Sequence, residues 1–236
     1  MQQLVIVLLA SWLAGATAFL GAVIGRLEGS AETELKQELV HGIIAFGGGI
    51  LLAAVALALV PEGMNNLSAL PLTIIFCTGG IIFCRIDAHL ASKGGSKAQF
   101  LAMLMDFVPE AISLGAVFSH NRDLGIVLAV FIGAQNLPEG FNSFRELVAA
   151  KLKSGQAMLL LLAASLLGPL AACAGYFLLQ GQAQLTAGIM IFASGGIIYL
   201  IFQDIAPQAS MLRHWTPPLG AVLGFTVGML GQALLG

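Results

Sequence analysis

Eight apolar stretches follow one another along the chain, separated by short segments rich in Gly, Pro, Ser, Asn and charged residues. Each stretch is close to the roughly 20 residues that a helix needs to cross a bilayer. The expected spans are 3–25, 38–61, 70–91, 98–119, 123–148, 157–180, 184–206 and 217–235. The first stretch lacks a preceding basic region and is long enough to span, so we expect a membrane helix rather than a cleaved signal peptide.

The basic residues predict the orientation of these spans, because cytoplasmic loops carry an excess of Lys and Arg. If both termini lie outside, nine of the ten basic residues fall at inner ends of spans and only Arg122 falls outside. The inner set is Arg26, Lys36, Arg85, Lys93, Lys97, Arg145, Lys151, Lys153 and Arg213. The charge pattern therefore predicts that both termini lie outside the cytoplasm.

With 58% hydrophobic and only 9% charged residues, nearly all of the chain must lie in lipid or against other apolar helices. We therefore predict an all-α integral membrane protein with a single transmembrane domain over 1–236. The net charge of −2 gives no indication of nucleic-acid binding. Cys77, Cys84 and Cys173 lie inside apolar runs without the spacing of a metal finger, so we expect them to be small core residues.

Spans two and seven share a sequence pattern when one is laid over the other without gaps at an offset of 146. The matched pairs are Phe46 with Phe192, Gly49 with Gly195, and Pro61 with Pro207. Because these spans run in opposite directions, we expect spans 1–3 and 6–8 to be inverted repeats that flank spans 4 and 5. Such a 3+2+3 arrangement is typical of transporters that bind their substrate near the membrane midplane.

Spans four and five each carry a short polar motif midway along an apolar run. The motifs are Asp106-Phe-Val-Pro109-Glu110-Ala and Gln135-Asn-Leu-Pro138-Glu139-Gly140, which start 29 residues apart. Positions i and i+4 share a helix face, so Asp106 lies beside Glu110, and Gln135 lies beside Glu139. The proline of each motif cannot donate a backbone hydrogen bond, and we expect it to kink its helix.

Three carboxyl groups and an amide near the middle of a membrane are costly unless a cation compensates their charge. The set Asp106, Glu110, Gln135 and Glu139 offers only oxygen ligands, which suits a hard or borderline divalent ion. Three carboxylates carry one negative charge more than such an ion neutralises, so we expect Glu110 or Glu139 to be protonated. The alternative is that protonated carboxyl groups only join helices through hydrogen bonds.

Other polar residues close to the two motifs could assist the ion. Ser113 and Asn142 each lie seven residues beyond a first ligand, on the same helix face. Together with Asn136, they could bind water molecules of the ion. Met103 and Met105 are expected to pack in the interior rather than to bind metal.

Polar residues at the ends of spans are candidates for an ion pathway. The residues that could line an exit to the cytosol are Asp87, His89, Gln203 and Asp204. The alternative is an interfacial helix end at which Arg85 pairs with Asp87 or extends toward the membrane surface. Glu62, at the outer end of span two, could attract cations at an entrance, or it could be a solvated helix end.

The two motifs resemble the paired His-Asn-x-Pro-Glu-Gly signatures on the fourth and fifth spans of ZIP (Zrt/Irt-like) metal transporters. Phe46-Gly-Gly-Gly with Val60-Pro61-Glu62 is similar to the family's second span, and Gly195-Gly-Ile-Ile-Tyr199 through Asp204 and Pro207 is similar to its seventh. The resemblance implies uptake of zinc, iron or manganese into the cytosol through a site between spans four and five. It also implies a rocking or elevator-like movement of one helix group against another, in the inner membrane of a bacterium.

The chain departs from the family pattern at positions that bind a second metal in many relatives. Asp106 and Phe107 replace the histidine and asparagine of the first motif, and Gln135-Asn136 stands in the second motif for His-Asn or Gln-Asp. Gly168-Pro169 stands where relatives often carry a glutamate before a proline. We therefore predict a single site whose preference shifts from zinc toward manganese or iron(II). Cadmium is a further candidate substrate, and we expect no cofactor.

Other classes of function fit the sequence less well. An intramembrane hydrolase would need a His-Glu-x-x-His helix or an aspartate pair in its own motif, and neither is present, so we expect no enzyme. A proton-linked carrier of another cation or a small solute is the main alternative, whereas a purely structural protein leaves the buried charge unexplained. The last span has a small-residue face that permits a homodimer but also fits internal packing: Gly220, Gly224, Gly228 and Gly231.

Overall fold

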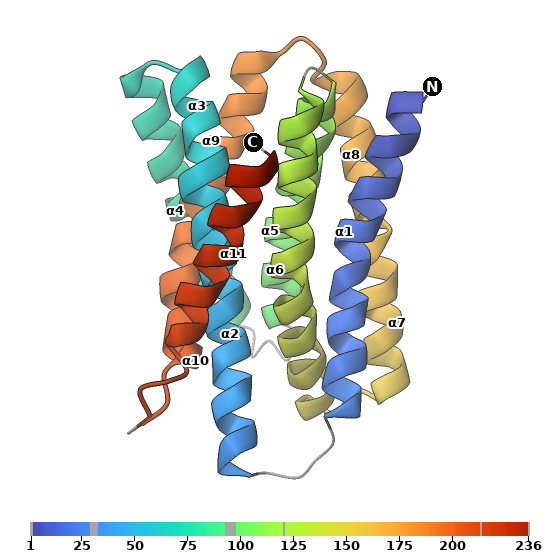
Figure 1. The fold of residues 1–236 in the computed structure, drawn as a ribbon, viewed down its shortest axis with the longest axis vertical. Helices are drawn as coiled ribbons and strands as arrows, with labels where there is room; N and C mark the ends of the chain where they lie inside the picture. Colours follow the sequence, from blue (N-terminus) through green and yellow to red (C-terminus); the bar gives the residue numbers. More distant parts are fainter. Residues whose placement is uncertain (1, 29–32, 93–97, 120, 213, 236) are drawn as a thin grey trace.

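The protein is a bundle of long helices (Figure 1). The structure, a computed structural model, describes residues 2–28, 33–92, 98–119, 121–212 and 214–235. The helices are α1 Gln2–Leu27, α2 Glu34–Ala54, α3 Val60–Asn66, α4 Ala69–Ser92, α5 Ala98–Phe118, α6 Arg122–Ala149, α7 Ser154–Ser165, α8 Leu167–Leu178, α9 Ala183–Leu200, α10 Ala206–Ala209 and α11 Leu219–Leu235. Two π-helical segments, η1 Val55–Leu59 and η2 Ile201–Ile205, connect α2 to α3 and α9 to α10. The described residues contain no β-strand, which confirms the predicted all-α class.

Six segments of the described chain are long and apolar enough to cross a membrane. They are Gln2–Leu27, Glu34–Asn66, Ala69–His89, Arg122–Ala149, Ser154–Leu178 and Ala183–Ala209, and a shorter apolar helix covers Leu219–Leu234. This pattern is that of an integral membrane protein. The prediction of eight spans requires α5 and α11 to cross the membrane as well, and it remains a prediction.

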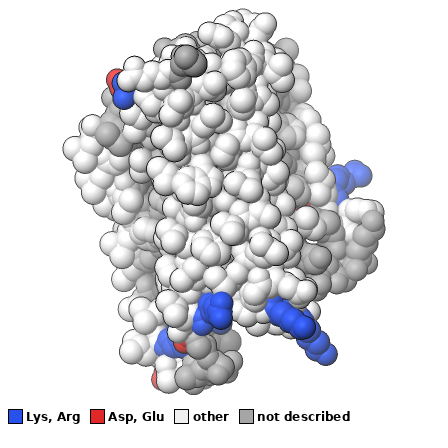
Figure 2. Space-filling model, turned by 90° about the vertical axis from the view of Figure 1, so that its right-hand side faces the viewer, with Lys and Arg blue, Asp and Glu red and all other residues white. Residues whose placement is uncertain are grey.

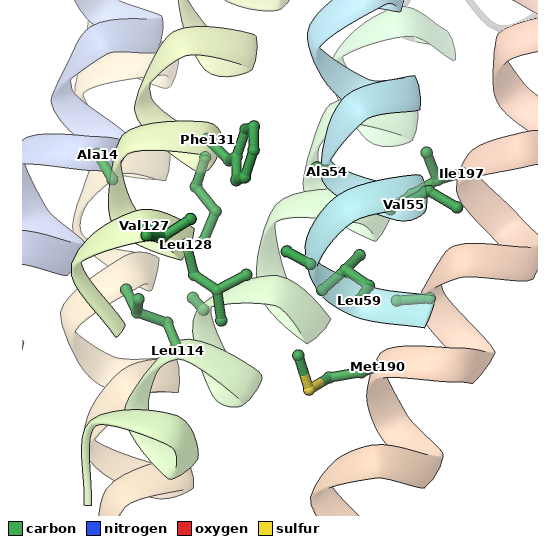
Figure 3. Packing of buried hydrophobic residues seen from close by; sticks show 14 of the residues in the cluster. Ala14, Ala54, Val55, Leu59, Leu114, Val127, Leu128, Phe131, Met190 and Ile197 are labelled. Atoms are coloured by element: carbon green, nitrogen blue, oxygen red, sulfur yellow. The ribbon is translucent and has the colours of Figure 1, made fainter. Parts of the chain in front are cut away.

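The helices form two groups that pack against each other (Figure 1). In the first group, α1 packs on α6, α7 and α8, and α5 packs on α6 and α8; in the second group, α2 packs on α11, and α4 packs on α9. Contacts of α2 with α6 and of α5 with α9 join the groups. Figure 3 shows the apolar core at this junction, where Leu114, Leu128 and Phe131 of the first group face Leu59 and Met190 of the second.

The segments η1 and η2 are single wide turns, and each ends two residues before a proline, Pro61 or Pro207. Val60 donates its backbone N–H to the oxygen of Val55, five residues back, and Ala206 donates to Ile201 in the same way. The following proline has no N–H and its ring crowds the carbonyl four residues back, so a wider turn relieves the clash. The two turns lie 146 residues apart (201 − 55), the offset at which spans two and seven match. Their helices run in opposite directions (Figure 1).

The prolines of the two polar motifs behave differently from those that follow η1 and η2. At Pro109 and Pro138, where we expected a kink, α5 and α6 continue as α-helix. A Cβ added to Gly47 of α2 would lie 2.7 Å from Cγ of Pro138, so this ring packs directly on the neighbouring helix. The change of helix type therefore occurs at the ends of spans two and seven rather than in the middle of α5 and α6.

Matching glycines allow close approach of helix backbones within the second group. A Cβ added to Gly49 of α2 would collide with the backbone oxygen of Ala221 in α11. A Cβ added to Gly195 of α9 would collide with the backbone oxygen of Phe76 in α4. Gly49 and Gly195 are matched at the offset of 146, so the α2–α11 and α9–α4 pairs pack through equivalent contacts.

Lys and Arg side chains on the surface are concentrated toward one end of the bundle. Both termini lie toward the upper end in Figure 1, opposite the lower end, where α1 ends and α2 begins. Most of the Lys and Arg side chains on the face shown in Figure 2 lie toward this lower end, beneath a band with few charges. Of the basic residues expected at the inner ends of spans, Lys93, Lys97 and Arg213 lie outside the described residues.

Candidate metal centre

Helices α5 and α6 carry the two polar motifs into the middle of the bundle. Asp106, Glu110, Gln135 and Glu139 are buried, with exposed fractions of 3%, 3%, 0% and 7%. Their spacing of four residues puts the two polar groups of each helix on one face, and the packing of α5 on α6 brings these faces together inside the protein. The motif side chains are therefore buried among helices rather than directed to lipid.

Gln135 joins the two helices through a hydrogen bond. Its Nε2 donates to Oε2 of Glu110 at 2.5 Å, whereas its Oε1 has no hydrogen-bond partner. An amide has both a donor and an acceptor end. Gln135 can therefore hold Glu110 and still present an oxygen to a cation.

A small internal cavity of about 20 Å³ is lined by Asp106, Glu139 and Asp204. A cavity of this size can hold one water molecule or one bare ion. The remaining lining residues are apolar: Leu51, Met103, Ile197, Leu200 and Ile205. The cavity brings together carboxyl groups from α5, α6 and η2, and its lining comes from both helix groups.

Several buried oxygens on α5 and α6 have no hydrogen-bond partner. They are Oδ1 of Asp106, Oγ of Ser113, Oε1 of Gln135, Oδ1 of Asn136 and Oε2 of Glu139. Each such atom costs roughly 1–3 kcal/mol, and a charged atom costs more. Oxygens of this kind are the ligands that hard divalent ions take in proteins, so a bound cation would offset part of this cost.

The carboxyl groups do not yet form a closed coordination shell. Within the part of the chain that the structure describes, no three His, Cys, Asp or Glu side chains are close enough to enclose a metal ion. Asp106 and Glu139 share the cavity, whereas Glu110 is engaged by Gln135. An ion at Asp106 and Glu139 would therefore take further ligands from Gln135, from water or from a repositioned Glu110.

The three residues expected to assist the ion have different surroundings. Asn136 donates from Nδ2 to the backbone oxygen of Ala14 at 3.0 Å, so its side chain is fixed on α1. Ser113 is buried, with an exposed fraction of 1%, and its hydroxyl has no partner. Asn142 is only half-buried. Ser113 and Asn136 are thus buried, while Asn142 is half-buried, and their binding of water molecules of the ion remains a prediction.

The structure brings together only part of the predicted exit. Asp204 lines the cavity and is within electrostatic range of Asp87, which accepts a hydrogen bond from the Tyr199 hydroxyl at 2.8 Å. Gln203 and His89 are exposed and do not line the cavity. Of the four predicted exit residues, Asp204 borders the cavity and Asp87 lies near Asp204, and the exit itself remains a prediction.

The predicted entrance residue, Glu62, lies on α3, away from the cavity. Its side chain is half-buried and its Oε1 accepts a hydrogen bond from Nδ2 of Asn66, one turn further along, at 2.9 Å. Asn66 also donates to the Glu62 backbone oxygen at 2.9 Å. These hydrogen bonds link the last residue of α3 to the preceding turn. They are compatible with Glu62 as an entrance residue and with Glu62 as a solvated helix end.

Phe107 fills the space beside the motif on the side facing α1 and α8. Its exposed fraction is 3%, and a Cβ added to Gly15 or Gly168 would lie 2.8 or 2.7 Å from its ring atom Cζ. The ring therefore occupies the space that side chains at Gly15 and Gly168 would otherwise enter. None of the carboxyl groups that line the cavity is among the atoms nearest to these two glycines.

Met103 lines the cavity, although we expected it only to pack in the interior. It borders the cavity with Asp106 and Glu139, and its Sδ lies 3.9 Å from the hydroxyl of Ser143. Met103 precedes Asp106 by three residues and so shares its helix face. That spacing was the signal in the sequence that could have placed its sulfur beside the carboxyl groups.

Comparison with known proteins identifies similar chains. A family model described as ZIP Zinc transporter matches residues 96–236, which is more than half of the chain. The chain is also 28% identical over 155 residues to a protein of Myxococcus xanthus named Zinc transporter GufA. That match covers 64% of this chain and 60% of the relative, so the chain spans somewhat less than two thirds of the relative's length.

Proposed function

Because the chain belongs to the ZIP zinc transporter family, we propose that it carries a divalent transition-metal ion across the membrane. The ion binds at Asp106, Glu110, Gln135 and Glu139, between α5 and α6. The observation that carries this proposal is the group of buried oxygens without partners beside a cavity that Asp106 and Glu139 share. Such groups remain in a protein interior at high cost unless they bind something.

The proposed architecture has eight spans in a 3+2+3 arrangement, with spans 1–3 and 6–8 as inverted repeats. Support comes from the π turns η1 and η2 at an offset of 146 and from the equivalent glycine contacts at Gly49 and Gly195. The helix pairs also correspond. The packing of α2 on α11 in one repeat is equivalent to that of α9 on α4 in the other, and the packing of α1 on α6 is equivalent to that of α8 on α5. Internal symmetry of this kind supplies two similar conformations in which a central site opens to opposite sides.

In the proposed transport step, the two helix groups move relative to each other. The cavity lies on their junction, because Asp106 and Glu139 come from the first group, whereas Asp204, Leu51 and Ile197 come from the second. A shift of one group would therefore change which side of the membrane the carboxyl groups face. Asp204 and Asp87 would then receive the ion on its way toward the lower end.

We propose uptake into the cytosol across a bacterial inner membrane, with both termini outside. The concentration of Lys and Arg toward the lower end favours that end as the cytoplasmic one. The proposed site binds a single ion. Phe107, an apolar ring, fills the space near Gly168, where a second set of ligands would have to lie.

Uptake measurements on the purified chain test this function. In proteoliposomes we expect saturable uptake of Zn²⁺, Mn²⁺, Fe²⁺ or Cd²⁺, and no comparable uptake of Mg²⁺, which loses its hydration water reluctantly. The assay is accumulation of each metal inside the vesicles, with protein-free liposomes as control. Equal uptake with and without protein for all five metals would contradict the proposal.

The second candidate function is a proton-linked carrier of another cation or a small solute. The buried carboxyl groups favour it to the same extent as they favour metal transport, since such groups also serve as proton relays. The uptake series separates the two candidates. Movement of protons or a monovalent cation without any transition-metal transport would favour the carrier.

A further inference from the structure

A cavity much larger than the one at the carboxyl groups opens at the lower end of the bundle, between α1, α2, α6 and α7. Its volume is about 590 Å³. Its charged lining residues are Arg26, Glu28, Lys36 and Arg145. The described lining therefore contains three cations and one carboxylate. This excess of positive charge disfavours binding of a cation and favours binding of an anion.

Glu28, the carboxylate of the described lining, contacts two of the three cations. Glu28 lies 3.3 Å from Lys36 Nζ and 3.6 Å from Arg145 Nε, so two cations share it. Arg26 Nη1 instead lies 3.2 Å from the sulfur of Met158, which is a weak acceptor. Within the described lining, the cations therefore outnumber the carboxylates, and Arg26 and Arg145 are exposed enough to reach a ligand.

A further donor points to the same kind of ligand. Ser154 lines the cavity as the first residue of α7, and its hydroxyl is buried without a partner. Lys153 occupies the N-cap position of α7, but its side chain makes no capping hydrogen bond to the backbone of the helix. The first backbone N–H groups of a helix favour an anion, particularly a phosphate. Two arginines, a lysine and a hydroxyl around one space are typical phosphate ligands.

The position of the cavity indicates which kind of molecule would supply a phosphate group to it. The lining includes apolar side chains, Val40, Phe144 and Val148, beside the basic ones. The cavity lies toward the lower end of the bundle, where Lys and Arg side chains gather (Figure 2). Basic spaces between membrane helices at the cytoplasmic surface bind anionic lipid headgroups. We propose that this cavity binds the phosphate headgroup of an anionic phospholipid from the cytoplasmic leaflet.

Binding of defined lipids to the full-length chain in detergent tests the proposal. The probes are phosphatidylglycerol, phosphatidylcholine and inorganic phosphate, measured by native mass spectrometry and by the shift of the thermal unfolding midpoint. We expect phosphatidylglycerol to bind at least tenfold more tightly than phosphatidylcholine. The double variant Arg26→Gln/Arg145→Gln should lose about tenfold or more of that affinity.

The matched control, Arg85→Gln/Lys151→Gln, removes the same charge from residues that do not line the cavity and should bind phosphatidylglycerol like the parent. If the first double variant fails to fold, as judged by gel filtration, the single variant Arg145→Gln takes its place. Equal binding of the two lipids, or equal loss in both double variants, would overturn the proposal. Stabilisation by inorganic phosphate without any preference for phosphatidylglycerol would overturn the lipid as the ligand.

Discussion

Replacing Glu139 by glutamine should reduce metal uptake into proteoliposomes by about 100-fold or more. The change keeps the size of the side chain but removes one of the three carboxyl groups that line the small cavity. Loss of one charge from a buried ion pair costs roughly 3–5 kcal/mol, which corresponds to a loss of at least about 100-fold in binding of the ion. Asp106→Asn should have a similar effect, measured as the initial rate of Zn²⁺ or Mn²⁺ accumulation.

The control for this prediction is Asp123→Asn, which removes an exposed carboxylate from the first turn of the same helix, α6. It should leave uptake unchanged. Thermal unfolding without metal separates binding from packing. Because Oε2 of Glu139 has no hydrogen-bond partner, Glu139→Gln should not lower the unfolding midpoint. Normal uptake by the folded Glu139→Gln and Asp106→Asn proteins would remove these carboxylates from the transport path.

Substitution of Gly140 by alanine should destabilise the protein by roughly 3 kcal/mol, the upper end of the range for overpacking. A Cβ at this position would collide with the backbone oxygen and Cα of Ala18 in α1. Backbone atoms cannot rotate away as a side chain can, so α1 and α6 would have to separate. The effect is measured as the shift of the unfolding midpoint in detergent and as the yield of monodisperse protein.

Gly133→Ala is the matched control because it makes the same change on the same helix. There the nearest atom, Cα of Ala14, lies 3.5 Å from the added Cβ, an ordinary van der Waals distance. We expect Gly133→Ala to be neutral or slightly stabilising, since alanine favours a helix over glycine by up to about 1 kcal/mol. Equal midpoints for the two variants would show that α1 and α6 are not packed as closely as described.

The helical architecture could be predicted from the sequence because long apolar runs and turn residues specify membrane helices locally. The span expected at 70–91 is the helix Ala69–Ser92, and the span expected at 123–148 is Arg122–Ala149. The match of Pro61 with Pro207 also corresponds to a physical feature, since each follows a π turn. Those turns themselves could not be predicted, because Pro109 and Pro138 lie in helices that remain α-helical.

Burial of the four motif residues also followed from the sequence, since charged groups in a membrane helix must face the protein interior. Their mutual arrangement did not follow. Spacing along one helix does not determine that Gln135 bonds to Glu110 or that Asp204 lines the same cavity as Asp106. These contacts depend on how separate helices rotate and pack. The basic cavity at the lower end brings together four helices and was not predicted for the same reason.

A structure determined with bound Mn²⁺ or Zn²⁺, using anomalous scattering to locate the ion, tests the central claim most directly. We predict one peak per chain, about 2.0–2.3 Å from carboxylate oxygens of Asp106 and Glu139, with Gln135 or Glu110 adjacent. Two peaks bridged by Glu110 and Glu139 would contradict the single site. A peak elsewhere, with Asp106 and Glu139 free of metal, would contradict the site itself.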